Sequence, residues 1–197
     1  MLKRAFDLVV AGAVLVVLSP LMAILALIVK LESPGPVLFR QGRVGRDGQA
    51  FTMYKFRTMK TQHADALSTV PQVSNFKEYV FEPLYGGKEY TRLGEFMRSA
   101  SLDELPNLFN VLRGEMSLVG PRPEVPELVA QYPQEYQRRH AVRPGITGLA
   151  QVNGRSDLTY HEAMLYDLDY ADRHSLLRDV AILLRTVPAV FSRKGAY

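Results

Sequence analysis

The sequence predicts an α+β fold in which a re-entrant membrane helix, a short β-hairpin and several amphipathic and interfacial helices surround one candidate active site. Three observations lead to this prediction. Residues 5–29 form a long apolar run. A glycine-rich loop with the turn pair Asp47-Gly48 separates two stretches that are rich in strand-forming residues. Beyond residue 90, apolar side chains recur at the three- and four-residue spacing of helices with one buried face.

The composition of the chain limits its chemistry. With 197 residues the chain is long enough to bury one sizeable core. It contains no cysteine, which excludes disulfides, thiolate metal sites and cysteine nucleophiles, and fits a reducing compartment. The 24 Lys and Arg against 20 Asp and Glu give a net charge of +4. This mild excess favours an anionic partner, but it does not distinguish a membrane surface from a nucleotide or a nucleic acid.

The apolar run predicts a membrane segment with a break at Ser19-Pro20. A straight helix of about 25 residues would reach about 37 Å, which is enough to cross a hydrocarbon core of about 30 Å. Pro20 removes one helical N–H group, and its ring clashes with the carbonyl group of Val16. We therefore expect a bend near the middle of the segment, where the Ser19 hydroxyl can satisfy a freed backbone group.

Two membrane topologies stay open for this segment, a spanning helix and a re-entrant helix. A cleavable signal peptide is disfavoured, because the run is too long and no small-residue cleavage site follows it. The cations after the run place its carboxyl side in the cytoplasm. A spanning helix would leave Lys3 and Arg4 on the opposite side, whereas a re-entrant helix keeps every cation on one face. We therefore favour a re-entrant anchor at residues 1–32 and a cytosolic-face domain at residues 33–197. The cations after the run include Lys30, Arg40, Arg43, Arg46, Lys55 and Arg57.

A β-hairpin is expected after the membrane segment, with strands at residues 37–41 and 50–57. The loop between them contains the Asp47-Gly48 turn signal. Because side chains alternate faces along a strand, we expect Lys55 and Arg57 to point the same way, about 6 to 7 Å apart. Two cations at this spacing fit a diphosphate, and they fit a solvated cationic strand face equally well.

Two adjacent carboxylates, Asp103 and Glu104, open a predicted helix that Gly114 stops. The free N–H groups and the dipole at a helix N-terminus attract carboxylates and phosphates alike. A second interpretation is a capping box, because Ser101 and Glu104 have its spacing and Asp103 would then be an ordinary first-turn residue. The buried stripe of this helix comprises Leu105, Leu108, Phe109 and Leu112.

Four arginines are candidates for substrate binding, since a guanidinium suits phosphate contacts. Arg98 ends a short amphipathic stretch five residues before the first acid, and Arg122 lies in the stiff turn Gly120-Pro-Arg-Pro123. Arg143 and Arg155 bracket a glycine-rich loop whose backbone N–H groups can approach a ligand closely. Each of these features also fits a plain surface charge or turn.

Two further helices are expected near residues 160–173 and 176–191. In the first, Asp167 and Asp169 are either metal ligands or solvated charges. The second has an apolar face that either packs into the core or lies on a membrane interface. Residues 62–87 contain no motif that indicates a role.

Together these motifs resemble the bacterial sugar transferase family, the small monotopic phosphoglycosyl transferases. The motifs occur in the order of the family and cover nearly the whole chain except residues 62–87. They are the apolar segment with Ser19-Pro20, Tyr54-Lys-Phe-Arg-Thr-Met59, Arg98 with Ser101-Leu-Asp-Glu-Leu-Pro-Asn107, Val119-Gly-Pro-Arg-Pro123 and Arg143-Pro-Gly-Ile-Thr-Gly148.

The resemblance implies an enzyme that moves a phosphosugar from a UDP-sugar to polyprenol (undecaprenyl) phosphate. It would release UMP and form polyprenol diphosphate sugar in the first membrane step of bacterial glycan assembly. The enzyme would be monotopic on the cytoplasmic face of the inner membrane, with membrane lipid and not nucleic acid as a partner. The sugar, the glycan pathway and a possible homodimer stay open.

The same resemblance implies roles for individual residues. Asp103 would be the nucleophile that forms a covalent phosphosugar intermediate, and Glu104 would hold Mg²⁺. Arg98 would contact phosphate. The other cations that would line the site are Lys55, Arg57 and Arg122.

Two rival functions can be separated from this one by simple assays. A membrane-tethered binding module would hold anionic lipid or nucleic acid, with the acids serving only as a cap. Its affinity should fall steeply with salt and need no Mg²⁺. A nucleotide-sugar hydrolase would release UMP with water alone as acceptor. The transferase should release UMP only with Mg²⁺ and a polyprenol phosphate.

Overall fold

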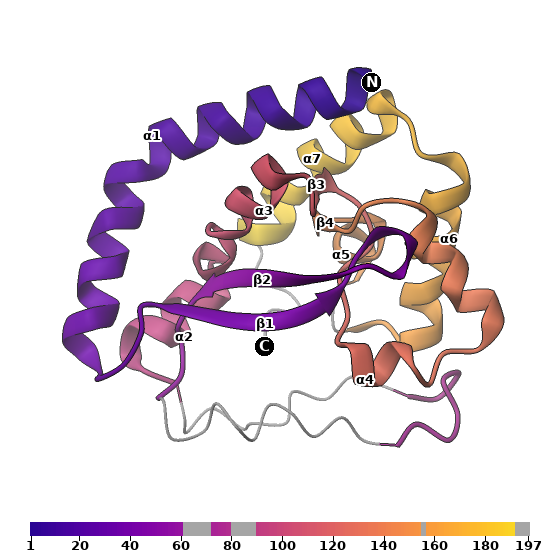
Figure 1. The fold of residues 1–197 in the computed structure, drawn as a ribbon, viewed down its shortest axis with the longest axis horizontal. Coiled ribbons are helices and arrows are strands. Elements are labelled where there is room, and N and C mark those ends of the chain that lie inside the picture. Colours follow the sequence, from indigo (N-terminus) through magenta and orange to yellow (C-terminus); the bar gives the residue numbers. More distant parts are fainter. Residues whose placement is uncertain (61–71, 80–89, 155–156, 192–197) are drawn as a thin grey trace.

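A long bent helix, α1 (Leu2–Glu32), arches over a domain of shorter helices and small strand pairs (Figure 1). The computed structural model describes residues 1–60, 72–79, 90–154 and 157–191. Within these residues the strands form one antiparallel pair and one parallel pair. This mixture of helices and strands confirms the predicted α+β class.

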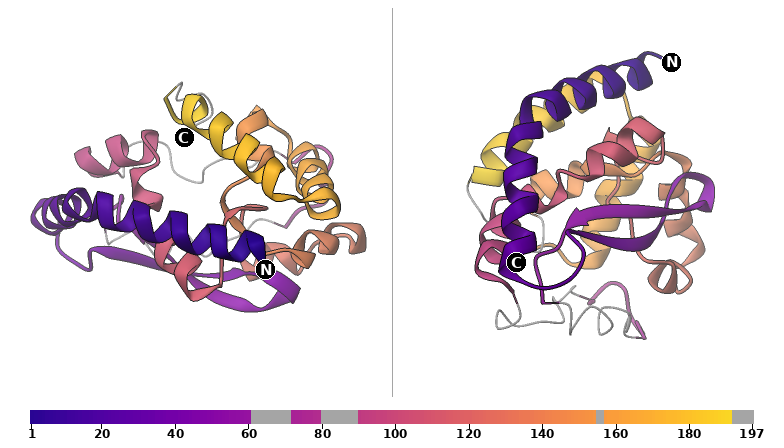
Figure 2. Two further views of the ribbon diagram at one scale, coloured as in Figure 1. Left: turned by 90° about the horizontal axis from the view of Figure 1, so that it is seen from above. Right: turned by 60° about the vertical axis from the view of Figure 1, so that its left-hand side comes forward.

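Helix α1 bends in its middle without being interrupted, so its two arms run in different directions (Figure 1 and Figure 2). Pro20 lies inside the helix and cannot donate to the carbonyl oxygen of Val16. The Ser19 hydroxyl donates to that oxygen instead, at 2.9 Å. The predicted bend and its compensating hydrogen bond are therefore confirmed, although the helix continues through Ser19-Pro20 rather than breaking there.

The predicted hairpin is present. Strands β1 (Leu38–Val44) and β2 (Ala50–Phe56) pair antiparallel, with Leu38 opposite Phe56 and Val44 opposite Ala50. A 3₁₀ turn, η1 (Arg46–Gly48), connects them, and in it Asp47 and Gly48 have φ values of 55° and 76°. Asp and Gly tolerate this left-handed conformation better than other residues, which explains why the pair marks the turn.

The segment with the two acids differs from the prediction. Helix α2 (Arg92–Ser99) leads into a 3₁₀ turn, η4 (Leu102–Glu104), and α3 (Asn107–Arg113) begins only after it. The capping-box interpretation is wrong, because Ser101 has a left-handed backbone (φ 56°, ψ 20°) and its side chain forms no capping hydrogen bond. Gly114, with φ 86°, ends α3 as predicted.

The parallel pair explains the glycine-rich loop. Strand β3 (Ser117–Val119) runs beside β4 (Gly145–Thr147). A Cβ atom on Gly145 would lie 2.1 Å from the backbone nitrogen of Gly120, and one on Gly148 would lie 2.3 Å from the oxygen of Gly120. These glycines therefore allow main chains to approach one another closely.

The remaining elements are α4 (Pro126–Val129), the 3₁₀ helix η5 (Gln134–Ala141), α5 (Leu149–Asn153), α6 (Tyr160–Arg173) and α7 (Leu176–Phe191). The two helices expected after residue 160 are thus confirmed. Helix α7 packs into the core through Ile182, while Leu177 and Leu184 are exposed; its expected contact with a membrane interface stays a prediction.

The first arm of α1 is fixed to the domain by buried polar contacts. Asp7 is 2% exposed and accepts hydrogen bonds from Ser117 Oγ at 2.9 Å and from Leu118 N at 3.2 Å. These partners matter because an unpaired carboxylate in an apolar setting is costly. Lys3 forms an ion pair of 2.6 Å with Asp179 of α7.

The second arm packs on the same domain through apolar side chains. Leu25 and Val29 form a core cluster with Phe56 of β2 and Met97 of α2. Both ends of α1 therefore contact one body of the protein, the first through β3 and α7 and the second through the hairpin and α2.

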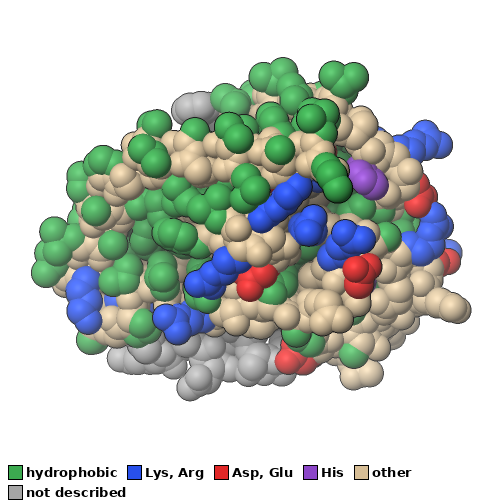
Figure 3. All heavy atoms as spheres, turned by 45° about the horizontal axis from the view of Figure 1, so that its top comes forward, with side chains coloured by type: hydrophobic (Ala, Val, Ile, Leu, Met, Phe, Trp, Pro, Cys, Tyr) green, Lys and Arg blue, Asp and Glu red, His purple; other side chains and the backbone are tan. Residues whose placement is uncertain are grey.

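Large apolar side chains are exposed along α1 and gather on the face shown in Figure 3. Among the described residues, α1 is the helix long and apolar enough to cross a membrane, and only 11% of its most apolar window is buried. This exposure supports membrane association of the protein. The exposed apolar residues include Val9, Val16, Val17, Leu27 and Leu31 of α1, Phe109 of α3, and Leu177, Leu184 and Val187 of α7.

Candidate active site

The two acids lie in η4, where α2, β2 and the start of α3 meet. Asp103 is only 6% exposed, although an aspartate side chain in water is charged at neutral pH. Lys55 reaches this turn from β2, and Arg122 reaches it from the turn after β3. The structure thus brings together four residues from three segments of the chain, and the outermost two, Lys55 and Arg122, are 67 positions apart in the sequence.

One carboxylate oxygen of Glu104 contacts two cationic side chains. Its Oε1 atom lies 2.7 Å from Lys55 Nζ and 3.1 Å from Arg122 Nη2. Burial alone would raise the pKa of Glu104, but Lys55 and Arg122 outweigh it and hold the pKa well below its usual range. Burial also lowers the pKa of Lys55, despite the attraction of Glu104. The lowered pKa favours the ionised form of Glu104 at neutral pH.

Asp103 has the opposite tendency. Burial and the neighbouring charge of Glu104 raise its pKa from 3.8 to about 6, while Lys55, Arg98 and Arg122 act to lower it. Two adjacent carboxyl groups whose pKa values are driven apart are suited to different tasks. Glu104 suits charge binding, and Asp103 is a desolvated carboxylate with raised basicity at neutral pH.

Arg98 comes from the last turn of α2, and its position depends on how α2 docks. The Thr91 hydroxyl caps the helix by accepting from Gly94 N at 3.0 Å. A Cβ atom on Gly94 would lie 2.0 Å from the carbonyl oxygen of Thr58, so only glycine allows this approach. The Arg98 guanidinium lies 5.3 Å from the ring centroid of Tyr90, close enough to the turn to influence the pKa of Asp103.

Arg57 and Lys55 have different partners. Lys55 contacts Glu104, whereas Arg57 contacts the main chain around the end of α1, so the structure does not bring the two cations together at the acids. Arg57 is 6% exposed and donates to the carbonyl oxygens of Val29 at 3.1 Å, Ser33 at 2.6 Å and Pro36 at 2.6 Å. Its guanidinium fixes the carboxyl end of α1 to the hairpin.

The structure also places Arg143 away from the acids. Its Nε atom donates to Gly114 O at 2.8 Å, at the carboxyl end of α3, whereas the acids precede the amino end of that helix. Seven helical residues separate the two places, or about 10 Å. Arg155 lies outside the described residues, so its expected role stays a prediction.

Several charged residues near the site gave no clear signal in the sequence. Arg43 and Arg139 both donate to main-chain carbonyl groups of the turn that carries Arg122. Asp167, expected as a metal ligand or a solvated charge, is neither, because it is buried in a 2.5 Å ion pair with Arg139. In the sequence, Arg139 stands in a polar run that reads as surface charge.

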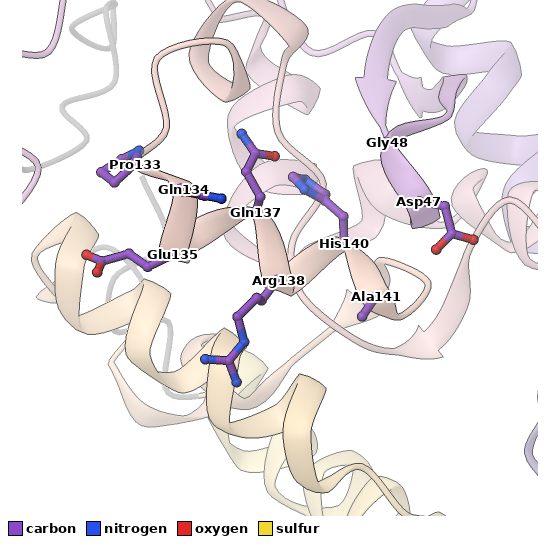
Figure 4. Close-up of a pocket in the computed structure, with 9 residues that line it drawn as sticks. All are labelled: Asp47, Gly48, Pro133, Gln134, Glu135, Gln137, Arg138, His140 and Ala141. Carbon is purple, nitrogen blue, oxygen red and sulfur yellow. The ribbon is translucent and has the colours of Figure 1, made fainter.

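One open depression in the surface lies away from the acids. It has a volume of about 1000 Å³ and lies between the η1 turn and η5, with Asp47, Arg138 and His140 among its lining residues (Figure 4). None of the predicted site residues lines it. We therefore define the candidate active site by its charged residues.

The donor set fits a metal that the substrate helps to hold. Among the described residues, no group of three or more acidic or histidine side chains gathers at one place. Mg²⁺ commonly takes one or two carboxylates and completes its shell with phosphate oxygens and water. Lys55 and Arg122 both contact Oε1 of Glu104. The other carboxylate oxygen, Oε2, takes part in neither of these two contacts.

Comparison with known proteins identifies related chains. The model of a family described as bacterial sugar transferase matches residues 1–193. A UDP-glucose:undecaprenyl-phosphate glucose-1-phosphate transferase of Caulobacter vibrioides is 42% identical over 203 residues, covering 99% of this chain and 72% of that protein. The exopolysaccharide production protein ExoY of Rhizobium meliloti is 36% identical over 200 residues, covering 100% of this chain and 88% of its own.

A third relative is longer. The UDP-glucose:undecaprenyl-phosphate glucose-1-phosphate transferase of Escherichia coli is 42% identical over 205 residues. The match covers 100% of this chain, which spans 42% of the length of that protein.

Proposed function

This chain belongs to the bacterial sugar transferase family, and we propose that it transfers a phosphosugar from a UDP-sugar to a polyprenol phosphate such as undecaprenyl phosphate. The products are UMP and polyprenol diphosphate sugar. Two relatives are named for a reaction of this type with UDP-glucose. The observation that carries the proposal is a buried carboxylate of raised pKa next to a carboxylate that binds two cations, on a body with an exposed apolar helix.

In the first step, Asp103 attacks the phosphorus atom that bears the sugar. A bond forms between a carboxylate oxygen of Asp103 and this phosphorus, and the bond from the phosphorus to the bridging oxygen breaks. UMP leaves with the bridging oxygen and its electron pair, and an acyl phosphate joins Asp103 to the sugar phosphate. Covalent catalysis of this kind divides one transfer between two bulky anions into two steps.

In the second step, a phosphate oxygen of the polyprenol phosphate attacks the same phosphorus atom. The bond to Asp103 breaks, the carboxylate is restored, and polyprenol diphosphate sugar is formed. Both steps bring anions together, so the site must neutralise charge. Lys55, Arg98 and Arg122 supply positive charge around the two acids.

We assign Mg²⁺ to Glu104. When bound, the ion would neutralise negative charge on the diphosphate of the substrate. The low pKa of Glu104 keeps this ligand ionised at neutral pH, and Lys55 and Arg122 hold its carboxylate in one orientation.

We further propose that α1 is a re-entrant anchor, which places the enzyme on the cytoplasmic face of the bacterial inner membrane. Both arms of α1 contact the same body, through Lys3 and Asp7 in one arm and through Leu25 and Val29 in the other. A spanning helix would separate these contacts by the thickness of the bilayer. The anchor would keep the acids at the headgroup level, where a lipid phosphate is available and the nucleotide sugar arrives from the cytoplasm.

The experiment that tests this function is an assay of UMP release by the full chain in detergent, with a panel of UDP-sugars. We expect repeated turnover only with Mg²⁺ and a polyprenol phosphate present together, with at most one UMP released per protein when the acceptor is left out, and we expect one UDP-sugar to be preferred. Release with water as the acceptor would instead indicate a hydrolase. No release with any sugar, together with salt-sensitive binding of anionic lipid, would indicate a binding module.

A further inference from the structure

The turn that carries Arg122 is held through its carbonyl groups. Pro121 and Pro123 flank Arg122, and proline has no N–H group to donate. Pro121 O accepts from Gly145 N at 2.9 Å, Arg122 O from Arg139 Nη2 at 2.6 Å, and Pro123 O from Arg43 Nη1 at 3.0 Å. Three separate elements, β4, η5 and β1, therefore fix three consecutive residues.

Arg139 is the partner of the main chain of Arg122 itself. It is 3% exposed, and the atom that bonds Arg122 O also forms the 2.5 Å ion pair with Asp167 of α6. Its other terminal nitrogen donates to the Tyr132 hydroxyl at 2.9 Å, which in turn bonds the Tyr160 hydroxyl. The planar guanidinium has its donors in a fixed geometry, so these three acceptors define where the group lies.

The side chain of Arg122 depends on this support. It is 47% exposed and contacts Glu104 through one nitrogen at 3.1 Å. A half-exposed arginine loses much rotamer freedom when it is held in one contact, so the direction of its main chain decides how often the contact forms. Arg139 fixes that direction.

We propose that Arg139, clamped by Asp167, is a positioning residue that orients Arg122 through its carbonyl oxygen and so places the second cation on Glu104. This inference rests on the proposed transferase function for its kinetic effect. A buried ion pair is weak support for stability, because apolar residues of similar size often replace such pairs without loss. Its position against the main chain of a site residue gives this pair a role beyond packing.

The test compares three variants of the full chain in detergent. Removing only one member of a buried pair costs about 3 to 5 kcal/mol of stability, so both are replaced together, as Arg139→Met with Asp167→Leu. Arg122→Gln removes the positioned side chain itself. The matched control is Arg138→Gln, which removes the neighbouring arginine of η5, whose ion pair with Asp172 is exposed.

The first measurement is hydrogen exchange without substrate at the Gly145 amide, which donates to Pro121 O in the turn that carries Arg122. We expect exchange there to be about tenfold faster in the pair variant, with no change in α1 or in Arg138→Gln. Unchanged exchange at Gly145 would overturn the proposal. This arm does not depend on turnover, so it decides the inference even if the protein releases no UMP and the proposed function fails.

The second measurement is the kinetics of UMP release. We expect the pair variant to lower kcat about 10- to 100-fold with little change in KM for the UDP-sugar, as Arg122→Gln does. Combining all three substitutions should lower kcat by no more than about twofold beyond Arg122→Gln alone, because the pair variant and Arg122→Gln both remove the same contact between Arg122 and Glu104. The proposal would be overturned if the kcat losses of the pair variant and of Arg122→Gln multiply when the substitutions are combined. It would also be overturned if the kcat of the pair variant equals that of Arg138→Gln.

Discussion

Lys55 Nζ lies 2.7 Å from Glu104 Oε1 and joins the second strand of the hairpin to the turn that carries both acids. Both side chains are about 15% exposed, so the ion pair is shielded from water and salt. The contact helps to keep Glu104 ionised, whereas burial and the charge of Glu104 raise the pKa of Asp103, one residue earlier, to about 6.

Replacing Lys55 tests this relationship. We expect Lys55→Met to lower kcat about 10- to 100-fold, because Glu104 loses a charge-assisted hydrogen bond worth about 1.5 to 3 kcal/mol. Lys55→Arg should retain part of the activity. The matched control is Arg46→Gln, which removes an exposed hairpin cation paired with Asp47. Equal activity of Lys55→Met and the control would contradict the assignment.

The pH dependence follows from the raised pKa of Asp103. The carboxylate must be ionised to attack, so kcat/KM should be constant at neutral pH and fall about tenfold per unit below pH 6. Because Arg98 acts to lower this pKa, Arg98→Gln should move the acid limb to higher pH. An acid limb near pH 4, the ordinary range of an aspartate, would contradict a raised pKa for Asp103.

The left-handed backbone of Ser101 predicts an order of stabilities. Non-glycine residues in this conformation cost about 1 to 2 kcal/mol. Ser101→Gly should therefore match or exceed the stability of the unmodified chain, and Ser101→Val should lower it by about 1 to 2 kcal/mol, as measured by thermal unfolding in detergent. Ser101→Ala should stay within about 0.5 kcal/mol. A loss of about 1 kcal/mol in Ser101→Ala would instead indicate a capping hydroxyl.

The membrane topology can be tested because the chain contains no cysteine. Leu2 is 73% exposed at the start of α1, and Gln49 is exposed in the hairpin loop. We expect a membrane-impermeant maleimide to label Leu2→Cys and Gln49→Cys only after cells are permeabilised, because a re-entrant helix keeps both on the cytoplasmic side. Labelling of Leu2→Cys on intact cells would contradict re-entry.

Local patterns predicted those parts of the fold that local chemistry determines. Pro20 bends α1 because one hydrogen bond is missing, and Asp47-Gly48 turns the hairpin because both residues tolerate positive φ. The capping-box interpretation was wrong because the spacing of Ser101 and Glu104 does not determine the backbone conformation of the serine, which is left-handed here. No property of the four residues alone distinguishes the two conformations.

Long-range contacts determine the features of the site that the sequence did not predict. Arg57 was expected in the site because strand alternation pairs it with Lys55, yet three carbonyl groups near the end of α1 hold it elsewhere. Arg139 was overlooked because Asp167, its partner, lies 28 residues away. Asp103 and Glu104 could be identified from the sequence, whereas the division of their pKa values depends on the burial and cations that the fold supplies.

The central claim is that Asp103 carries the phosphosugar, and mass spectrometry of the protein tests it most directly. After incubation with the preferred UDP-sugar and Mg²⁺, without acceptor, we expect one phosphosugar adduct on the peptide that contains Asp103. The adduct should disappear when polyprenol phosphate is added and should not form in Asp103→Asn. An adduct on another residue, or near-normal turnover by Asp103→Asn, would contradict the account.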